Sequence, residues 1–374
     1  MRLLIVGAGP VGLALALALH RQGIRFRQVD KALAPSVHSK ALGVQARTLE
    51  ALAPFGVDAS IIDAALRPAG AVLHLGATAV PVPLSHAVHG RYPTMSLLPQ
   101  AETERLLAGA LAAAGAPPPE RGVAVVAAEA ATGRATLRHA DGREESGEYD
   151  HLLACDGAHS TLRKAAGIGF AGAAYEEQCV LADGSATGLL PAHLHVYPGH
   201  GSALIFFPLP GGSWRAVAML PADNARPEEG DLSHFQPPGV TFSDPHWWSA
   251  FRISHRIADR FRQGRVTLMG DAAHIHSPAG GQGMNLGIQD ACSLAIALPR
   301  GEAALEVWAA ERRRVAAMVV ARTDAMTRVI LGHGAGIRAA RAVALRVMPR
   351  IPAIRRRLER GLAGLDYPAI AAPV

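Results

Sequence analysis

The 374-residue sequence is 49% hydrophobic and 18% charged, which excludes a disordered protein and suffices for two or three units with buried cores. Its net charge of +6 comes mostly from arginines spread along the chain, a distribution that argues against a nucleic-acid partner. Cys155, Cys179 and Cys292 lack a pairing or metal-ligand spacing, which argues against a disulfide framework and favours a reducing compartment, the cytoplasm.

The first thirty residues predict a nucleotide-binding β-turn-α-β unit. An apolar run over residues 3–6 predicts a strand, residues 13–22 a helix that ends at Gly23, and residues 25–30 a second strand. Glycines interrupt the apolar sequence after the first strand, which argues against a secretory signal, because a signal has one unbroken apolar stretch. No other segment is long and apolar enough to span a bilayer.

The next part of the chain alternates between helical and strand patterns. Residues 42–52 and 100–114 predict helices, the second one stopped by Gly115 and a run of prolines. Residues 61–98 are richer in Pro, His and β-formers and predict an excursion from the nucleotide domain. Residues 123–149 predict short strands with a hairpin turn at Asp141-Gly142.

The second half contains a longer excursion, residues 171–260. Strand patterns lie within it at residues 194–197, 203–207 and 214–220, and we expect both excursions to form one antiparallel substrate sheet. Residues 265–269 predict a return strand, and a helix begins near Gly283. The sequence from about residue 302 onward predicts helices, with breaks near residues 332–336 and at Pro349 and Pro352.

A glycine motif follows the first predicted strand. Gly7 permits the tight turn, Gly9 lets the backbone approach a pyrophosphate, and Gly12 lets helix and strand pack closely. Asp30 ends the next strand, where an acidic side chain accepts hydrogen bonds from a ribose diol. The motif in this context predicts a dinucleotide site.

Three further segments carry a family resemblance: residues 152–163 with Asp156-Gly157, residues 264–274 with Gly270-Asp271, and residues 277–285. Together with the first motif they resemble the class A flavoprotein monooxygenases, the family of para-hydroxybenzoate hydroxylase and many polyketide and phenol hydroxylases. The resemblance extends over residues 1 to about 320 and implies FAD as the cofactor.

The implied fold class is α/β: a Rossmann-type FAD-binding domain with an inserted antiparallel β-sheet substrate domain and a C-terminal helical tail. We expect residues 1–60, 97–170 and 261–310 in the FAD-binding domain and residues 61–96 and 171–260 in the substrate domain. Residues 311–374 would form the C-terminal helices. The sequence ends after this short tail, so we expect no thioredoxin-like third domain.

The resemblance also implies site residues. The predicted catalytic residues are Arg47, which would lie close to the flavin and its phosphates, and Pro278, which would flank the site where the oxygen adduct forms. Asp156 would take part in binding FAD and the nicotinamide nucleotide, and Asp271 would bind the ribityl portion of FAD. The full predicted cofactor-binding set is Gly7, Gly9, Gly12, Asp30, Lys31, Arg47, Gln100, Asp156, Gly157, Asp271, Pro278, Gly280, Gly281, Gly283, Met284 and Asn285.

The glycine-rich segment before Gly283 also has a physical rationale. A loop that enters a helix presents backbone N–H groups, which stabilise the negative charge of a reduced flavin at its pyrimidine edge. The resemblance implies that NADH or NADPH binds transiently and reduces FAD. It further implies that O2 would add to the reduced flavin as a hydroperoxide, from which one oxygen atom would go to the substrate while the other leaves as water.

Residues 203–207 indicate what kind of substrate the second sheet would bind. Both faces of the expected strand are apolar, and neither offers an arginine to anchor a small carboxylate. We therefore expect an apolar, aromatic or polycyclic small molecule, with Tyr197, His195 or Arg215 supplying at most a polar contact. The alternative is that these apolar residues are ordinary sheet core.

Histidine pairs at 274/276 and 193/195 supply only two ligands each, so no metal site is expected. The basic cluster of Arg350, Arg355, Arg356, Arg357 and Arg360 is interpreted as a solvated helix face, the alternative being a surface for anionic lipid or an acidic partner.

Other functions remain open on the sequence alone. A halogenase of the same fold is disfavoured because the only close tryptophan pair is Trp247-Trp248 and none of the three lysines lies where a halogenase lysine is expected. An FAD-dependent reductase or oxidase is not excluded. A non-catalytic flavin-bound ligand-binding protein is disfavoured by the intact residues 278–285.

Overall fold

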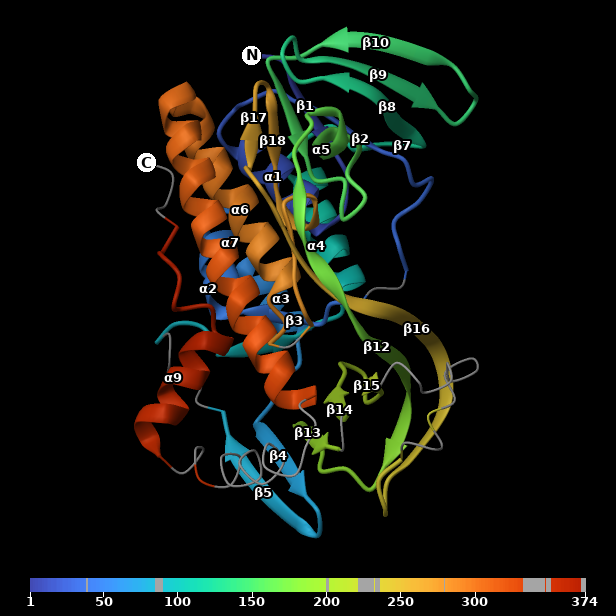
Figure 1. The fold of residues 1–374 in the computed structure, drawn as a ribbon. Coiled ribbons are helices and arrows are strands. Elements are labelled where there is room, and N and C mark those ends of the chain that lie inside the picture. The colour runs from blue at the N-terminus through green and yellow to red at the C-terminus, as the bar shows by residue number, and fades with distance from the viewer. Residues whose placement is uncertain are drawn as a thin grey trace.

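The computed structural model describes residues 1–37, 40–84, 90–199, 202–220, 232, 236–278, 280–331, 347 and 351–370. In Figure 1 a nucleotide-binding part with its helices lies at the top, and a second, larger sheet lies below it. The predicted mixed α/β fold is confirmed.

The nucleotide-binding part is built on a six-stranded sheet with the order β17-β18-β11-β1-β2-β7. Its strands are β17 (Arg262–Gln263), β18 (Val266–Leu268), β11 (His151–Ala154), β1 (Leu3–Val6), β2 (Arg27–Asp30) and β7 (Glu120–Arg121). All neighbours are parallel except β17 and β18. Every residue of β1 and β11 is buried, as expected for parallel strands covered on both faces.

Helices cover this sheet. The α-helices are α1 (Pro10–Arg21), α2 (Ala46–Leu52), α3 (Asp58–Ala64), α4 (Gln100–Ala113), α5 (Thr161–Ala165), α6 (Gly283–Ala297), α7 (Glu302–Leu331) and α9 (Pro352–Leu362), with 3-10 turns η1 (Ala53–Phe55), η4 (Gly270–Ala272) and η5 (Leu298–Arg300). The Ala- and Leu-rich α1 packs against both α4 and α6, so it lies at the centre of the largest core. None of the helices in the described ranges is long and apolar enough to cross a membrane.

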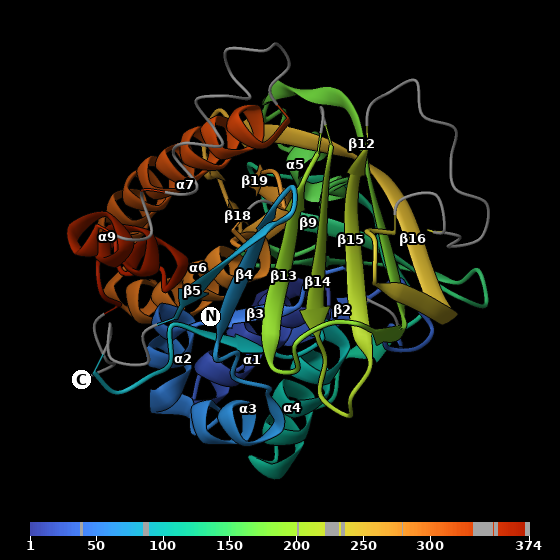
Figure 2. The ribbon, with the colours of Figure 1, turned by 90° about the horizontal axis from the view of Figure 1, so that it is seen from below.

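The second large sheet has eight strands in the order β19-β16-β12-β15-β14-β13-β4-β5. They are β4 (Gly70–Leu75), β5 (Thr78–Pro83), β12 (Phe170–Thr187), β13 (His193–Pro198), β14 (Ala203–Pro208), β15 (Trp214–Leu220), β16 (Thr241–Ala258) and β19 (His274–Ile275). The sheet thus joins three stretches of chain, because β19 pairs with β16 although residues 261–310 were expected in the FAD-binding domain. Figure 2 shows these strands side by side, with α7 and α9 opposite β4 and β5.

One contact in this sheet differs from the prediction of an antiparallel sheet. Strand β13 pairs with β4 in parallel, with His193 opposite Gly70 and Val196 opposite Leu73. The two strands come from separate excursions, so no hairpin connects them and their relative direction is not set by a local turn.

Smaller sheets complete the fold. The hairpin predicted at Asp141-Gly142 is confirmed: it joins β9 (Arg134–His139) to β10 (Glu144–Glu148), and β8 (Val123–Glu129) pairs with β9 on its other side. Strands β3 (Gly43–Gln45) and β6 (Met95–Leu97) form a two-stranded sheet.

The helix predicted over residues 42–52 is wrong in its first part, because residues 43–45 form β3 and α2 begins at Ala46. The backbone N–H of Gln45 donates to Asn285 Oδ1, and the carbonyl of Gly43 accepts from Asn285 Nδ2. These long-range partners replace the hydrogen bonds that a helix would supply. The breaks predicted at residues 332–336 and Pro349 lie outside the described residues.

Candidate active site

The predicted site residues follow the ends of four parallel strands. Gly7 comes directly after β1, Asp30 ends β2, Asp156 follows β11, and Asp271 follows β18. Because these strands are parallel neighbours, their carboxyl ends lie at one edge of the sheet. That edge is where ligands bind in open α/β sheets.

The glycine turn after β1 fits a bound pyrophosphate. A Cβ on Gly7, whose φ is 111°, would collide with the Cys155 carbonyl, and a Cβ on Gly12 would collide with the Gly7 carbonyl. Around an added Cβ on Gly9, by contrast, no atom of the described residues lies within 4 Å. Two glycines are therefore required by the fold, and the third leaves room for a ligand to approach the backbone.

The start of α1 is suited to an anion. Its N-cap residue is Gly9, which has no side chain to cap the helix, and no acidic residue lies in its first turn, so its first N–H groups and the helix dipole can face a phosphate. Asp30 is oriented beside it, because Oδ2 accepts from Ala8 N at 2.6 Å and Oδ1 from Ala32 N at 2.8 Å. Lys31 is exposed next to Asp30. The arrangement fits the adenosine diphosphate half of FAD.

A second uncapped helix start lies at α6. We call residues 277–285 the flavin-edge loop; Pro278 and Gly281 are exposed in it, whereas Met284 and Asn285 are buried. The side chain of the N-cap residue Gln282 makes no capping hydrogen bond to α6, and no acidic residue lies in the first turn of this helix. Asn285 Nδ2 donates to both Gly281 O and Gly43 O at 2.8 Å, so its amide holds this loop against β3.

Arg47 lies on α2, directly after β3, and Gln100 begins α4, where its backbone N–H donates to Ala41 O at 3.0 Å. Arg47 is buried in α2, forms an ion pair with Glu50, and donates through Nη2 to Tyr367 O at 3.3 Å. Its Nε atom is buried and has no partner within the described ranges. Gln100 Nε2 donates to Glu104 Oε1 at 2.8 Å.

Asp156 and Asp271 differ in how their carboxylate oxygens are placed. Asp156 Oδ2 accepts from Thr161 N at 2.7 Å and from Leu162 N at 3.3 Å, so it stabilises the start of α5. Its Oδ1 is buried without a partner in the described part of the chain. Gly157 follows with a φ of 77°. Asp271 is exposed at the sheet edge and can accept hydroxyl hydrogen bonds.

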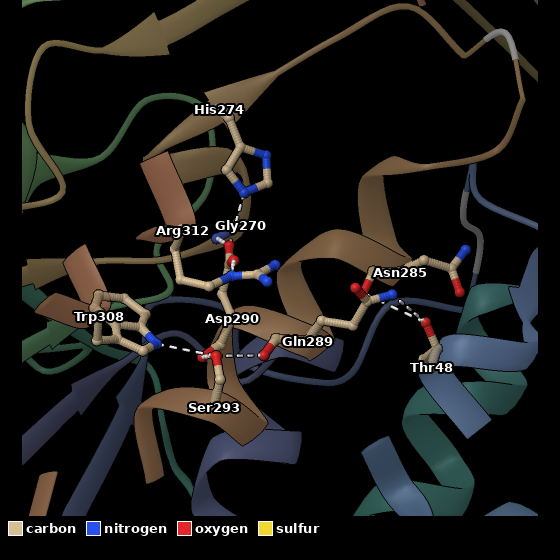
Figure 3. A network of polar contacts seen from close by, with 9 residues as sticks. All are labelled: Thr48, Gly270, His274, Asn285, Gln289, Asp290, Ser293, Trp308 and Arg312. Atoms are coloured by element: carbon tan, nitrogen blue, oxygen red, sulfur yellow. Dashed lines mark hydrogen bonds and ion pairs between the residues drawn. The ribbon is translucent and has the colours of Figure 1, made fainter. Parts of the chain in front are cut away.

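Asp290 was missed by the sequence analysis, and Figure 3 shows the network around it. Its Oδ2 accepts from His274 Nε2 at 2.7 Å and from Gly270 N at 3.2 Å, and its Oδ1 accepts from Arg312 Nε at 2.7 Å. Burial raises the pKa of Asp290, but Arg312 and His274 outweigh burial and hold the pKa below its usual value. The carboxylate therefore ties α6 and α7 to the turn that carries Asp271.

The network continues along α6 toward β3 and α2. Gln289 Nε2 donates to Thr48 Oγ1 at 3.1 Å, and Trp308 Nε1 donates to Ser293 Oγ at 2.9 Å (Figure 3). A signal for this network exists in the sequence, since Gln289, Asp290 and Ser293 are polar residues in the middle of a largely apolar helix.

His276 is predicted to make stability depend on pH. Burial and the neighbouring His274 lower the pKa of His276 from its ordinary value of 6.5 to about 4, so only the unfolded chain binds this proton between those values. The contribution of His276 to the free energy of unfolding should therefore be fully present above pH 6.5 and be lost as the pH drops toward 4. Urea unfolding across this range should show a shallower pH slope for His276→Gln, whereas exposed His159→Gln should keep the wild-type slope. Equal slopes for all three proteins would contradict the assignment.

Comparisons with known proteins agree with this geometry. The family model described as "FAD binding domain" matches residues 1–323. Pentachlorophenol 4-monooxygenase of Sphingobium chlorophenolicum is 34% identical over 89% of this chain and 66% of its own length. The 6-methylpretetramide 4-monooxygenase of Streptomyces rimosus is 35% identical over 98% of this chain and 69% of its own length. The chain thus spans about two thirds of these relatives.

Solved structures give the same result. The OxyS anhydrotetracycline hydroxylase from Streptomyces rimosus superimposes with a TM-score of 0.80 at 33% identity, covering 98% of this chain and 77% of that one. The p-nitrophenol 4-monooxygenase PnpA from Pseudomonas putida DLL-E4 has a TM-score of 0.86 at 22% identity and 98% coverage of both chains, which shows the shared fold. The chain therefore belongs to the FAD-binding domain family and, within it, to the class A flavin-dependent aromatic monooxygenases.

Proposed function

We propose that this chain uses NADPH or NADH and O2 to place one oxygen atom on a phenolic or polycyclic aromatic small molecule held against its eight-stranded sheet. Relatives named for pentachlorophenol and 6-methylpretetramide support this substrate class. The observation that carries the proposal is the position of two uncapped helix starts, α1 and α6, beside glycine-rich turns, one for each end of FAD.

We assign the predicted residues to FAD as follows. Gly7, Gly9 and Gly12 with the start of α1 would hold the pyrophosphate, Asp30 the adenosine ribose, and Asp271 the ribityl chain. The start of α6 would face the pyrimidine edge, and Pro278 would flank the reacting face. When bound, FAD would accept electrons from the nicotinamide nucleotide and pass them to O2. The chain's residues position it and exclude water.

The proposed substrate surface is the face of the eight-stranded sheet toward α7 and β3. Cys179, Leu181, Val217, Met219 and Ile253 form an apolar cluster against which Phe207 and, from α7, Ile330 pack. Phe207 also packs against a second cluster that contains Leu42, directly before β3. This apolar face is therefore continuous with the residues next to the flavin-edge loop, and it would recognise an aromatic ring system by shape and burial.

The polar residues considered for the substrate lie differently. Arg215 is on this face but is 2% exposed, and its Nε and Nη2 donate to the two Asp183 oxygens at 2.7 and 2.8 Å. Its charge is thus already paired, which supports an apolar rather than an anionic substrate. His195 and Tyr197 both lie on the opposite face of the sheet. There the His195 ring contacts Trp214, and the Tyr197 ring contacts Phe206.

The proposal is tested by incubating purified, FAD-loaded protein with NADPH or NADH and a panel of phenols, polycyclic aromatics and quinones. Isotopically labelled O2 shows whether one labelled oxygen enters the product, and hydrogen peroxide is measured in parallel. A compound that speeds nicotinamide oxidation and gains one labelled oxygen supports the proposal. Nicotinamide oxidation that yields only peroxide with every compound would instead indicate an oxidase.

Phe207→Ala is expected to raise the KM for the aromatic substrate roughly tenfold, because part of the apolar contact with the ring system is lost. The affinity for FAD should be unchanged, since Phe207 lies on the sheet and not on the nucleotide-binding part. Trp248→Ala is the matched control, because Trp248 pairs with Ala182 and so lies on the opposite face of the same sheet. A KM that rises equally in both variants would rule out this face as the substrate surface.

The cellular setting is also inferred. All three cysteines are unpaired, and Cys179 and Cys292 are buried, which supports the cytoplasm as the compartment. In the basic cluster, Arg350 lies outside the described residues. Arg355 Nε lies 3.8 Å from Glu359 Oε1, and Arg360 Nη2 donates to Leu365 O at 3.1 Å, so part of the cluster has partners within the chain. These contacts favour a helix face over a lipid-binding surface.

A further inference from the structure

We propose that residues 361–367, the last two residues of α9 and the five that follow it, position the flavin-edge loop, with Tyr367 acting through Gln282. We call this segment the C-terminal strap. The inference rests on the proposed flavin site at that loop. It assigns a role to a segment that the sequence analysis treated only as the end of a helical tail.

The strap holds both ends of one side-chain amide. Gln282 Nε2 donates to Gly361 O at 3.2 Å, and Tyr367 donates its hydroxyl hydrogen to Gln282 Oε1 at 2.9 Å. Gln282 is 1% exposed and Tyr367 4% exposed, so neither hydrogen bond can be replaced easily by water. Gln282 is also the N-cap residue of α6, and its position sets where the first turn of this helix lies.

The strap is anchored to two further elements around the site. From α2, Arg47 N donates to Ala363 O at 3.0 Å and Arg47 Nη2 to Tyr367 O at 3.3 Å. From α7, Arg322 donates to Gly361 O and to Asp366 Oδ2, both at 2.7 Å. Because it is held from both sides, the strap can fix Gln282 relative to Arg47, the residue predicted to lie close to the flavin.

The packing of the strap leaves little room for movement. A Cβ on Gly364 would lie 2.9 Å from Gln45 Oε1 and 3.1 Å from Arg47 Cβ. Gln45 in turn contacts the flavin-edge loop, because its backbone N–H donates to Asn285 Oδ1 at 2.9 Å. The strap, β3, α2 and the flavin-edge loop are thus in one continuous set of contacts.

The test is Tyr367→Phe in the full chain, which removes only the hydroxyl. The FAD dissociation constant, measured by flavin fluorescence during titration of the apoprotein, should rise roughly three- to tenfold, the range expected for one buried hydrogen bond. Gln282→Leu should weaken FAD binding at least as much. The double variant should bind FAD no more weakly than Gln282→Leu alone, because both substitutions break the same link.

Tyr92→Phe is the matched control, since it removes another buried tyrosine hydroxyl, one that donates to Asp58 Oδ2 at 2.7 Å. It should lower the melting temperature without changing the FAD dissociation constant. An FAD dissociation constant within twofold of wild type for Tyr367→Phe, or additive effects in the double variant, would overturn the positioning role. If Gly281→Val also leaves FAD binding unchanged, the proposed flavin-edge site itself fails, and the two failures are thereby distinguished.

Discussion

A chain with Gly9→Val is expected to fold as stably as wild type and to bind FAD about a hundredfold more weakly, because the new side chain occupies the space through which a pyrophosphate reaches the backbone. Gly9 has φ −78° and ψ −173°, an extended conformation that valine adopts readily. No described atom lies within 4 Å of its added Cβ, so the fold itself accepts the side chain. Flavin fluorescence titration and thermal unfolding of the apoprotein measure the two quantities separately.

Two further glycine variants serve as controls for Gly9→Val. Gly109→Val also adds a side chain into open space, on the exposed face of α4, and should change neither FAD affinity nor folding by much. Gly12→Ala should instead destabilise the fold, because its Cβ would collide with the Gly7 carbonyl. Wild-type FAD affinity in Gly9→Val would mean that the glycines serve only the turn and that the cofactor does not approach here.

Asp290→Asn is expected to lower the free energy of unfolding by about 3–5 kcal/mol, the range for removing one partner of a buried ion pair. Arg312 is 4% exposed and would keep its charge without a carboxylate, and Gly270 N and His274 would lose their ionised acceptor. Urea unfolding of the apoprotein gives the value. FAD affinity should fall as well, because Asp290 holds the turn that carries Asp271.

The control for Asp290→Asn is Glu102→Gln, which breaks the pair with Arg105 on the exposed surface of α4. Such a surface pair contributes less than about 1 kcal/mol, so this variant should remain close to wild type. Replacing both Asp290 and Arg312 by leucine should cost less than Asp290→Asn, because no unpaired charge stays buried. A loss below about 1 kcal/mol for Asp290→Asn would show that the network is not a major source of stability.

The residues that sequence reasoning identified correctly as lying together share one property. Gly7, Asp30, Asp156 and Asp271 each lie at the end of a strand or within three residues after it, and the parallel order of those strands brings the positions to one edge. Local patterns of glycine, strand and helix therefore sufficed to predict that these positions share one edge, which we propose binds the nucleotide. The same patterns misplaced the start of α2, because the partner of Gln45 is Asn285, 240 positions away.

The residues that were missed depend on distant partners. Asp290 pairs with Arg312 one helix later, and Gln282 pairs with Tyr367, 85 positions further along. Nothing in the local sequence of residues 361–367 indicates a contact with the flavin-edge loop. Similarly, the apolar pattern of residues 203–207 left the two faces of β14 equivalent, and only the packing of Phe207 against the elements near β3 distinguishes them.

The α/β class follows from patterns within single strand-turn-helix units, and the FAD-binding family from the resemblance that four separated motifs carry. Each of these signals lies in residues that are close together along the chain. The tertiary structure alone decided the parallel contact of β4 with β13, the buried network of Asp290 and the contacts of the C-terminal strap. These features join segments whose separation along the chain carries no periodic signal. Their stability comes from burial and pairing that exist only once the chain has folded.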